Sequence, residues 1–212
     1  MSTMLVSSYE EADTRIIRSA DAVIDFDTFL KLNENDDYEL VDGVMEKKMA
    51  AGWGHEQLNI WLLTLLDLFV EQKKLGFVSS SRTTVHIDEF NGRMPDLLFI
   101  RRENAGIIRE SGLYGPPDLV IELISPTDRP SGIRAVETHY RKIGVPEIVF
   151  IDPRKKQVRL LRKRGEKYEE TALTKGEMNF ETVPGFVPQV EWLFADPRPE
   201  KFSLLHGLLG LR

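Results

Sequence analysis

Two segments of the chain contain the same motif, a Pro-Asp pair followed by an apolar run rich in β-branched residues. The first begins at Pro95-Asp96, and the second begins at Pro117-Asp118 and contains Glu122. Each run predicts a buried strand, where a carboxylate is unfavourable unless something pairs with it. Glu122 is therefore either a strand-end residue that reaches solvent or an arginine, or a carboxylate with a function.

The functional interpretation places Asp96 and Glu122 in one metal site. If their strands are neighbours, the two carboxylates converge, and a hard cation such as Mg2+ takes carboxylate oxygens while keeping several waters. Such carboxylates repel each other, so without metal at least one should have a raised pKa. Asp118 starts its strand four residues before Glu122, roughly 13 Å away along a strand. We therefore predict that Asp118 is structural, capping a turn or pairing with a basic side chain.

Composition limits the class of protein. The 212 residues suit one domain with a real core, and the absence of cysteine excludes disulfides and thiolate zinc sites. The N-terminus is polar and acidic, unlike a signal peptide, and the longest apolar stretch, 60–70, is too short to span a bilayer. We therefore expect a soluble, cytoplasmic protein.

Charge is unevenly distributed along the chain. The net charge of −6 argues against a high sequence-independent affinity for nucleic acid, because such affinity comes from neutralising phosphates. Residues 154–167, however, contain eight basic residues and a single glutamate. Such a run is either a solvated hairpin or a patch that faces phosphates.

Local patterns predict the elements that position these residues. Asp42-Gly43 indicates a tight hairpin, and His55 opens a long helix, about 55–74, with Gly76 as its expected C-cap. His55 is either a capping or packing histidine or a group near the site. The other expected elements are a short helix at 27–32, strands at 77–80 and 83–87, a helical turn at 107–110, a helix at 131–143, a buried strand at 147–152, and a hairpin formed by 158–162 and 168–172.

The ends of the chain differ from its centre. Residues 1–21 show no periodicity and are expected to be a flexible tail, 22–195 form the main domain, and 196–212 are an apolar extension. Two glycines make the segment 202–211 a poor autonomous helix. It either packs on its own domain or meets a partner chain, and we predict a homodimer, testable by light scattering.

The order of the motifs resembles the Uma-type putative restriction endonuclease family of the PD-(D/E)XK nuclease superfamily, over about residues 22–195. The matching motifs are Tyr38–Gly43, His55 at a helix start, Pro95-Asp96, Pro117–Pro126, Tyr140, Gly144–Glu147, Asp152-Pro153 and Val183–Phe186.

The resemblance implies an α/β, restriction-endonuclease-like core: a central mixed β-sheet flanked by helices, with an N-terminal hairpin and a C-terminal β-hairpin. It also implies an endonuclease that hydrolyses DNA with Mg2+ or Mn2+. Asp96, Glu122 and the carbonyl of Leu123 would hold the metal, and Glu39 matches an acidic residue on the first hairpin.

The chain departs from the family at the catalytic lysine. The superfamily places it two residues after the glutamate, where this chain has Ile124, and the family places it on the following helix, where this chain has Val136. The upstream aspartate of that helix is replaced by Gly132.

Two arginines are the nearest basic candidates. Arg134 falls on roughly the opposite side of the helix from Val136, whereas Arg129 lies in the loop after Glu122, so Arg129 is preferred. Cleavage is expected to be weak or absent; Arg129→Ala should remove whatever remains, and Val136→Lys should increase it. The alternative interpretation is a catalytically inactive nuclease-fold protein that binds nucleic acid or a protein partner.

Overall fold

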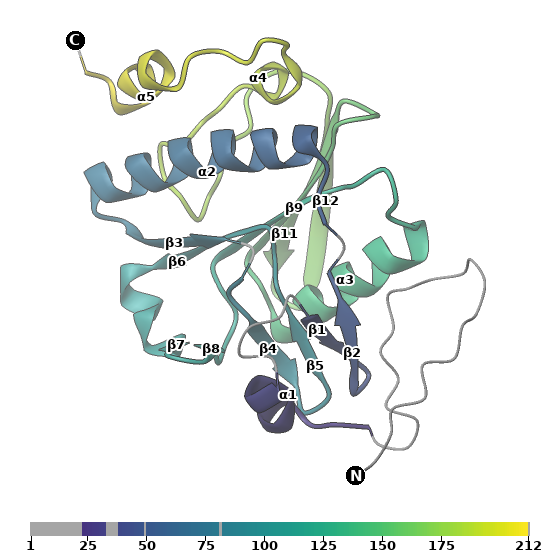
Figure 1. Ribbon diagram of the computed structural model, residues 1–212. Coiled ribbons are helices and arrows are strands. Elements are labelled where there is room, and N and C mark those ends of the chain that lie inside the picture. The colour runs from purple at the N-terminus through teal and green to yellow at the C-terminus, as the bar shows by residue number, and fades with distance from the viewer. Residues whose placement is uncertain (1–22, 33–37, 49, 81, 212) are drawn as a thin grey trace.

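The structure, a computed structural model, describes residues 23–32, 38–48, 50–80 and 82–211. The predicted N-terminal tail and the residues that follow the first helix, 33–37, lie outside the described residues. The described chain forms two mixed β-sheets flanked by helices (Figure 1). The predicted fold class is thus confirmed.

The larger sheet has the strand order β12-β11-β10-β9-β6-β3. Only β9 and β10 pair in parallel, and α3 (Pro130–Ile143) connects them, so the predicted crossover is confirmed. The bounds are β3 (Gly76–Ser80), β6 (Leu97–Arg101), β9 (Leu119–Leu123), β10 (Glu147–Asp152), β11 (Gln157–Arg164) and β12 (Lys167–Leu173).

The smaller sheet has the order β2-β1-β5-β4-β8-β7. Its first hairpin turns at Asp42-Gly43, where both residues have positive φ, 49° and 75°, as the tight turn requires. Helix α1 (Phe26–Leu32) packs on this sheet. The bounds are β1 (Tyr38–Val41), β2 (Val44–Lys47), β4 (Val85–Asp88), β5 (Asn91–Arg93), β7 (Ile108–Arg109) and β8 (Gly112–Leu113).

Alternation along β9 divides its side chains between two cores. Leu119, Ile121 and Leu123 pack into the core under α2 (Trp53–Lys73), whereas Val120 and Ile124 pack into the core under α3. Figure 1 shows α2 across one face of the larger sheet and α3 on the other side. Because side chains alternate along a strand, Glu122 belongs to the α3 face.

Two local predictions are wrong. Helix α2 ends at Lys73, within one residue of the predicted end, but its left-handed C-cap is Lys74 (φ 55°) rather than Gly76. Gly76 instead begins β3, where a Cβ atom would collide with the carbonyl oxygen of Ile100. The helical turn expected at 107–110 lies earlier, as a 3-10 helix over Arg102–Ile107, because Ile108 and Arg109 pair with β8.

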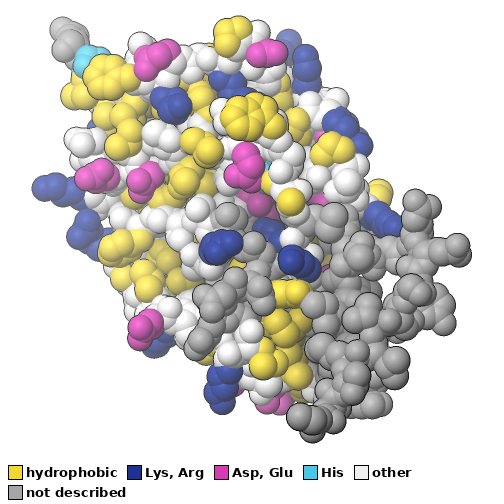
Figure 2. Space-filling view, in the orientation of Figure 1, with side chains coloured by type: hydrophobic (Ala, Val, Ile, Leu, Met, Phe, Trp, Pro, Cys, Tyr) yellow, Lys and Arg dark blue, Asp and Glu magenta, His cyan; other side chains and the backbone are white. Residues whose placement is uncertain are grey.

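The C-terminal extension folds back on its own domain. After α4 (Val190–Phe194), α5 (Lys201–Leu209) packs on α2, with Leu205 buried in the same core. Glu200 caps α5 by accepting hydrogen bonds from two backbone amides, which offsets the weak helix propensity of the segment. Phe202 remains 72% exposed, and hydrophobic side chains gather over α5 at the upper left of Figure 2.

Much of the apolar surface of the C-terminal extension is therefore covered by its own domain, without a partner chain. The homodimer stays a prediction. Among the described residues, no helix has the length and apolar character needed to cross a membrane.

Candidate active site between the two sheets

Asp96 and Glu122 lie on one face of the larger sheet. The antiparallel register of β6 and β9 pairs Leu98 with Val120, and continuing it by two residues places Asp96 opposite Glu122. Directly opposed side chains on one face are near neighbours. The structure therefore brings the two predicted carboxylates together, as the repeated motif on neighbouring strands suggested.

Glu122 is held from the α3 side. The hydroxyl of Tyr140, on α3, donates a 2.6 Å hydrogen bond to Glu122 Oε1. Burial, followed by the negative charge of Asp96, raises the pKa of Glu122 to about 8, although Lys48 and Tyr140 act in the opposite direction. The expectation that one carboxylate has a raised pKa is confirmed.

Asp96 is held by the neighbouring strand and by α2. Its Oδ2 accepts a 2.8 Å hydrogen bond from the backbone amide of Leu123 and lies 3.3 Å from His55 Nε2. Burial raises the pKa of Asp96, but the hydrogen bond from His55 and the charge of Lys48 outweigh it, so the pKa lies below its usual value. At neutral pH Asp96 is thus ionised, while Glu122 is largely protonated.

His55 lies in the first turn of α2, beside the metal-binding oxygens that the resemblance implies. Its Nε2 is 3.1 Å from the carbonyl oxygen of Leu123 as well as 3.3 Å from Asp96. The hydrogen bond with Asp96 raises the pKa of His55 despite partial burial. The structure therefore places His55 beside Asp96 and the Leu123 carbonyl. Of the two interpretations given for His55, this favours a group near the site.

Lys48 enters the cleft from the segment that follows β2. Its Nζ donates a 2.6 Å hydrogen bond to the carbonyl of Met94 and lies 3.5 Å from Asp96 Oδ1. The side chain is only 27% exposed. Burial lowers the pKa of Lys48, but Asp96, Glu39 and Glu122 together outweigh burial and raise it.

Glu39 joins the hairpin of the smaller sheet to the strand that leads into Asp96. Its two carboxylate oxygens accept hydrogen bonds from Arg93 and from the backbone amide of Met94, both 2.8 Å long. The Arg93 side chain is 5% exposed and also donates to His139 on α3. Glu39 thus forms a structural clamp, since it attaches the β1–β2 hairpin to the segment that precedes Asp96. It also lies close enough to Lys48 to affect its pKa.

A cleft of about 870 Å³ contains these groups. Arg129 lines it at the start of α3, and so do Gly132 and Val136. Arg134 is exposed and is not among the lining residues, as its place on the helix predicted. Figure 2 shows acidic and basic side chains close together below the N-terminal end of α2.

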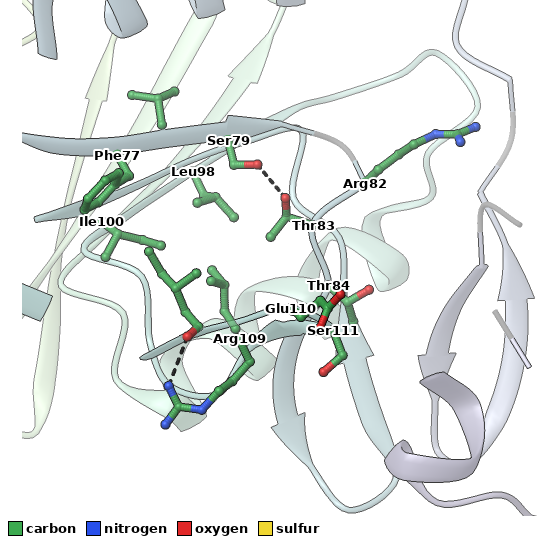
Figure 3. Close-up of a pocket in the computed structure, with 14 residues that line it drawn as sticks. Phe77, Ser79, Arg82, Thr83, Thr84, Leu98, Ile100, Arg109, Glu110 and Ser111 are labelled. Carbon is green, nitrogen blue, oxygen red and sulfur yellow. Dashed lines mark hydrogen bonds between the residues drawn. The ribbon is translucent and has the colours of Figure 1, made fainter. Parts of the chain in front are cut away.

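A second cavity, of about 290 Å³, lies between β3, β6 and the β7–β8 hairpin (Figure 3). More of its lining surface is apolar than polar. Two of the polar lining residues, Ser79 and Thr83, hydrogen-bond to each other through their hydroxyl groups. Arg109 bonds to backbone carbonyls of its own loop, and Figure 3 shows Arg82 extending away from the cavity. The described lining contains a single carboxylate, Glu110, so it holds no pair of acids comparable to that of the larger cleft.

Ion pairs account for much of the basic run at 154–167. Arg159 bonds to Glu137 and Glu170, and Arg162 bonds to Glu147. Arg164 and Lys155 also have acidic partners. These pairs favour the solvated-hairpin interpretation over the phosphate-facing one.

Asp118 has the structural role predicted for it. It is 2% exposed and accepts 2.8 Å hydrogen bonds from the Arg101 amide and the Asn104 side chain. The Nε atom of Arg101 also lies 3.8 Å from Asp118 Oδ1. The prediction that Asp118 caps a turn or pairs with a basic residue is confirmed.

The donor atoms at the cleft suit a hard cation. No group of three acidic, histidine or cysteine side chains in metal-binding arrangement occurs in the described parts of the chain. The set of donors that the resemblance implies consists of two carboxylates and one backbone carbonyl, from Asp96, Glu122 and Leu123, all oxygen. Mg2+ accepts such a set because it keeps several of its waters.

Lys48 was not identified as a site residue from the sequence, although the pairing of the first hairpin could have indicated it. The two-residue turn fixes the hairpin register, in which Glu39 faces Glu46. Because side chains alternate, Lys48 then lies on the same face of the hairpin as Glu39. Glu39 was already a candidate site residue. The register therefore predicts that Lys48, and not Lys47, shares the face of the hairpin that carries Glu39.

The fold and the opposed carboxylates define the class as restriction-endonuclease-like. Residues 25–194 match the sequence profile of the Uma2 family, described as putative restriction endonuclease, and the chain belongs to this family. A putative nuclease belonging to DUF820 from Anabaena variabilis ATCC 29413 has a similar structure, with a TM-score of 0.66 at 20% identity, over 81% of this chain and 97% of that chain. No curated protein matches this chain.

Proposed function

We propose that this protein is an endonuclease that hydrolyses phosphodiester bonds of DNA with Mg2+ or Mn2+. The observation that carries the proposal is the opposition of Asp96 and Glu122 near the Leu123 carbonyl, in a cleft of about 870 Å³. Family membership supports the same conclusion. A bound Mg2+ would supply a nucleophilic water at neutral pH and offset the charge that develops on the phosphate.

The protein groups have separate tasks in this proposal. Asp96 is already ionised and held by the Leu123 amide, so it offers a preorganised ligand. Glu122 gives up its proton when the cation binds, because a positive charge favours the carboxylate form. His55 has to share or release the Asp96 and Leu123 oxygens that it contacts.

A divalent cation makes the charge of the cleft more favourable for phosphate. The lining has five basic side chains (Lys47, Lys48, Arg82, Arg93 and Arg129) and six acidic ones (Glu39, Glu46, Glu56, Asp96, Glu122 and Asp128). Because Glu122 is largely protonated without metal, these charges balance in the metal-free cleft. A bound divalent cation, together with ionisation of Glu122, would give one net positive charge. We therefore expect divalent metal to strengthen the binding of DNA in the cleft.

The test is nicking of supercoiled plasmid with Mg2+ or Mn2+, in the wild type, Asp96→Asn and, as a matched control, Asp118→Asn. Cleavage should require metal, should be lost in Asp96→Asn and should survive in Asp118→Asn. Millimolar metal should also raise the melting temperature of the wild type, since a ligand of the folded state stabilises it. Absence of nicking by the wild type with either metal, or equal nicking by Asp96→Asn, would refute the proposal.

A further inference from the structure

The cleft contains three carboxylates near one ammonium group. Lys48 Nζ is 3.5 Å from Asp96 Oδ1, and Glu39 and Glu122 are close enough to influence its charge. A lysine in a surface segment normally directs its ammonium into water. Here the side chain turns inward and is fixed by the Met94 carbonyl at 2.6 Å.

The usual positions for a catalytic lysine are occupied by apolar residues, Ile124 and Val136, whereas Lys48 reaches the same cleft from the other sheet. Arg93 also lines the cleft, but it is not a substitute, because its side chain is almost fully buried and bonded to Glu39 and His139. Lys48, by contrast, places its ammonium against Asp96 in the lining of the cleft.

We infer that Lys48 is a catalytic residue of this site, binding the scissile phosphate through its ammonium in place of the lysine that the chain lacks after Glu122. The inference rests on the proposed function. An ammonium fixed in position before the substrate arrives stabilises negative charge without having to reorganise during the reaction.

The reaction balances without proton transfer by Lys48. A water oxygen forms a bond to phosphorus, and the bond from phosphorus to the leaving sugar oxygen breaks. The attacking water releases its proton to solvent, and the leaving oxygen takes a proton from another water. Lys48 keeps its proton, as expected for an amine whose ordinary pKa is about 10.4, and donates a hydrogen bond to a non-bridging phosphate oxygen.

The test compares Lys48→Met with Lys73→Met. Both variants lose one lysine charge, but Lys73 is exposed at the far end of α2, about 27 Å from His55 at 1.5 Å per residue. In Lys48→Met, plasmid nicking at saturating Mg2+ should fall about 100-fold or more, while the metal-induced rise in melting temperature persists. Lys73→Met should behave as the wild type.

Two further measurements separate contact with phosphate from a merely structural role. Binding of a fluorescent DNA duplex in Ca2+, followed against salt, should show a slope reduced by about 0.9 in Lys48→Met, as for the loss of one phosphate contact. Adding Val136→Lys to Lys48→Met should restore nicking, because position 136 lines the same cleft. If Lys48→Met does not fold, Lys48→Gln takes its place in both measurements.

Three outcomes would overturn the inference: nicking by Lys48→Met at the wild-type rate, loss of the metal-induced stabilisation in that variant, or an unchanged salt slope. If the wild type itself does not nick DNA, the proposed function fails. The salt slope then still decides whether Lys48 contacts phosphate.

Discussion

Replacing Glu122 with glutamine should stabilise the metal-free protein at alkaline pH. The pKa of Glu122 is about 8 in the folded protein against an ordinary value of 4.5. Below pH 4.5 both folded and unfolded chains carry a protonated Glu122, and its contribution to stability is fully present. Between pH 4.5 and 8 only the unfolded chain releases the proton, so the contribution is progressively lost as pH rises.

The size of the effect follows from the same two pKa values. At about 1.4 kcal/mol for each pH unit, the loss between them reaches up to about 5 kcal/mol. Glutamine carries no charge and its side-chain oxygen can still accept the hydrogen bond from Tyr140. At pH 8 Glu122→Gln should therefore melt on the order of 10 °C higher than the wild type, with little difference at pH 4.5.

Thermal melting in EDTA, scanned from pH 4.5 to 9, measures this difference. Glu71→Gln on the exposed side of α2 is the matched control and should follow the wild type throughout. With millimolar Mg2+ the order should change, because the wild type gains a ligand and Glu122→Gln does not. If Glu122→Gln is no more stable than the wild type at pH 8 in EDTA, Glu122 is ionised in the metal-free cleft and the electrostatic account of the site is wrong.

Two other variants test the structural roles around the site by urea unfolding. Glu39→Ala leaves the buried Arg93 guanidinium without its ion-pair partner and should lower the free energy of unfolding by about 3 kcal/mol; a change near zero would show that Arg93 finds another partner. Asp118→Ala removes the acceptor for the Arg101 amide and Asn104 and should lower it by about 1–3 kcal/mol. The Mg2+-dependent stabilisation should survive in Asp118→Ala, and its loss would place Asp118 in the metal site.

Short-range patterns in the sequence predicted most elements of the larger sheet. The doubled Pro-Asp motif identified β6 and β9 because both are apolar on both faces, and Asp42-Gly43 identified the hairpin because few other pairs adopt its turn. The pairing of β6 with β9, which sets Asp96 against Glu122, depends on long-range contacts, so it had to be assumed from the sequence when the two carboxylates were placed in one site.

Lys48 shows where the prediction from sequence stopped. Its position follows from the docking of the β1–β2 hairpin, which Glu39 fixes through Arg93 and the Met94 amide. A basic residue was therefore sought in the segments close to Glu122 along the chain, whereas the one that contacts Asp96 comes from a different sheet. The C-cap of α2 was assigned to the wrong residue for a similar reason, since Gly76 is required by the approach of the Ile100 carbonyl rather than by a helix cap.

The clamp formed by Glu39 has a consequence for how such sites change during evolution. It anchors the hairpin to the strand of Asp96 through groups other than the Lys48 side chain, so the hairpin can gain or lose a lysine without losing its attachment. A lysine could thus arise on the hairpin while another still served from a helix, and either could later be lost without an inactive intermediate. A sequence motif that requires lysine at one fixed spacing from the glutamate would then classify active enzymes as inactive. A search of structures for any lysine ammonium close to the aspartate carboxylate would identify them.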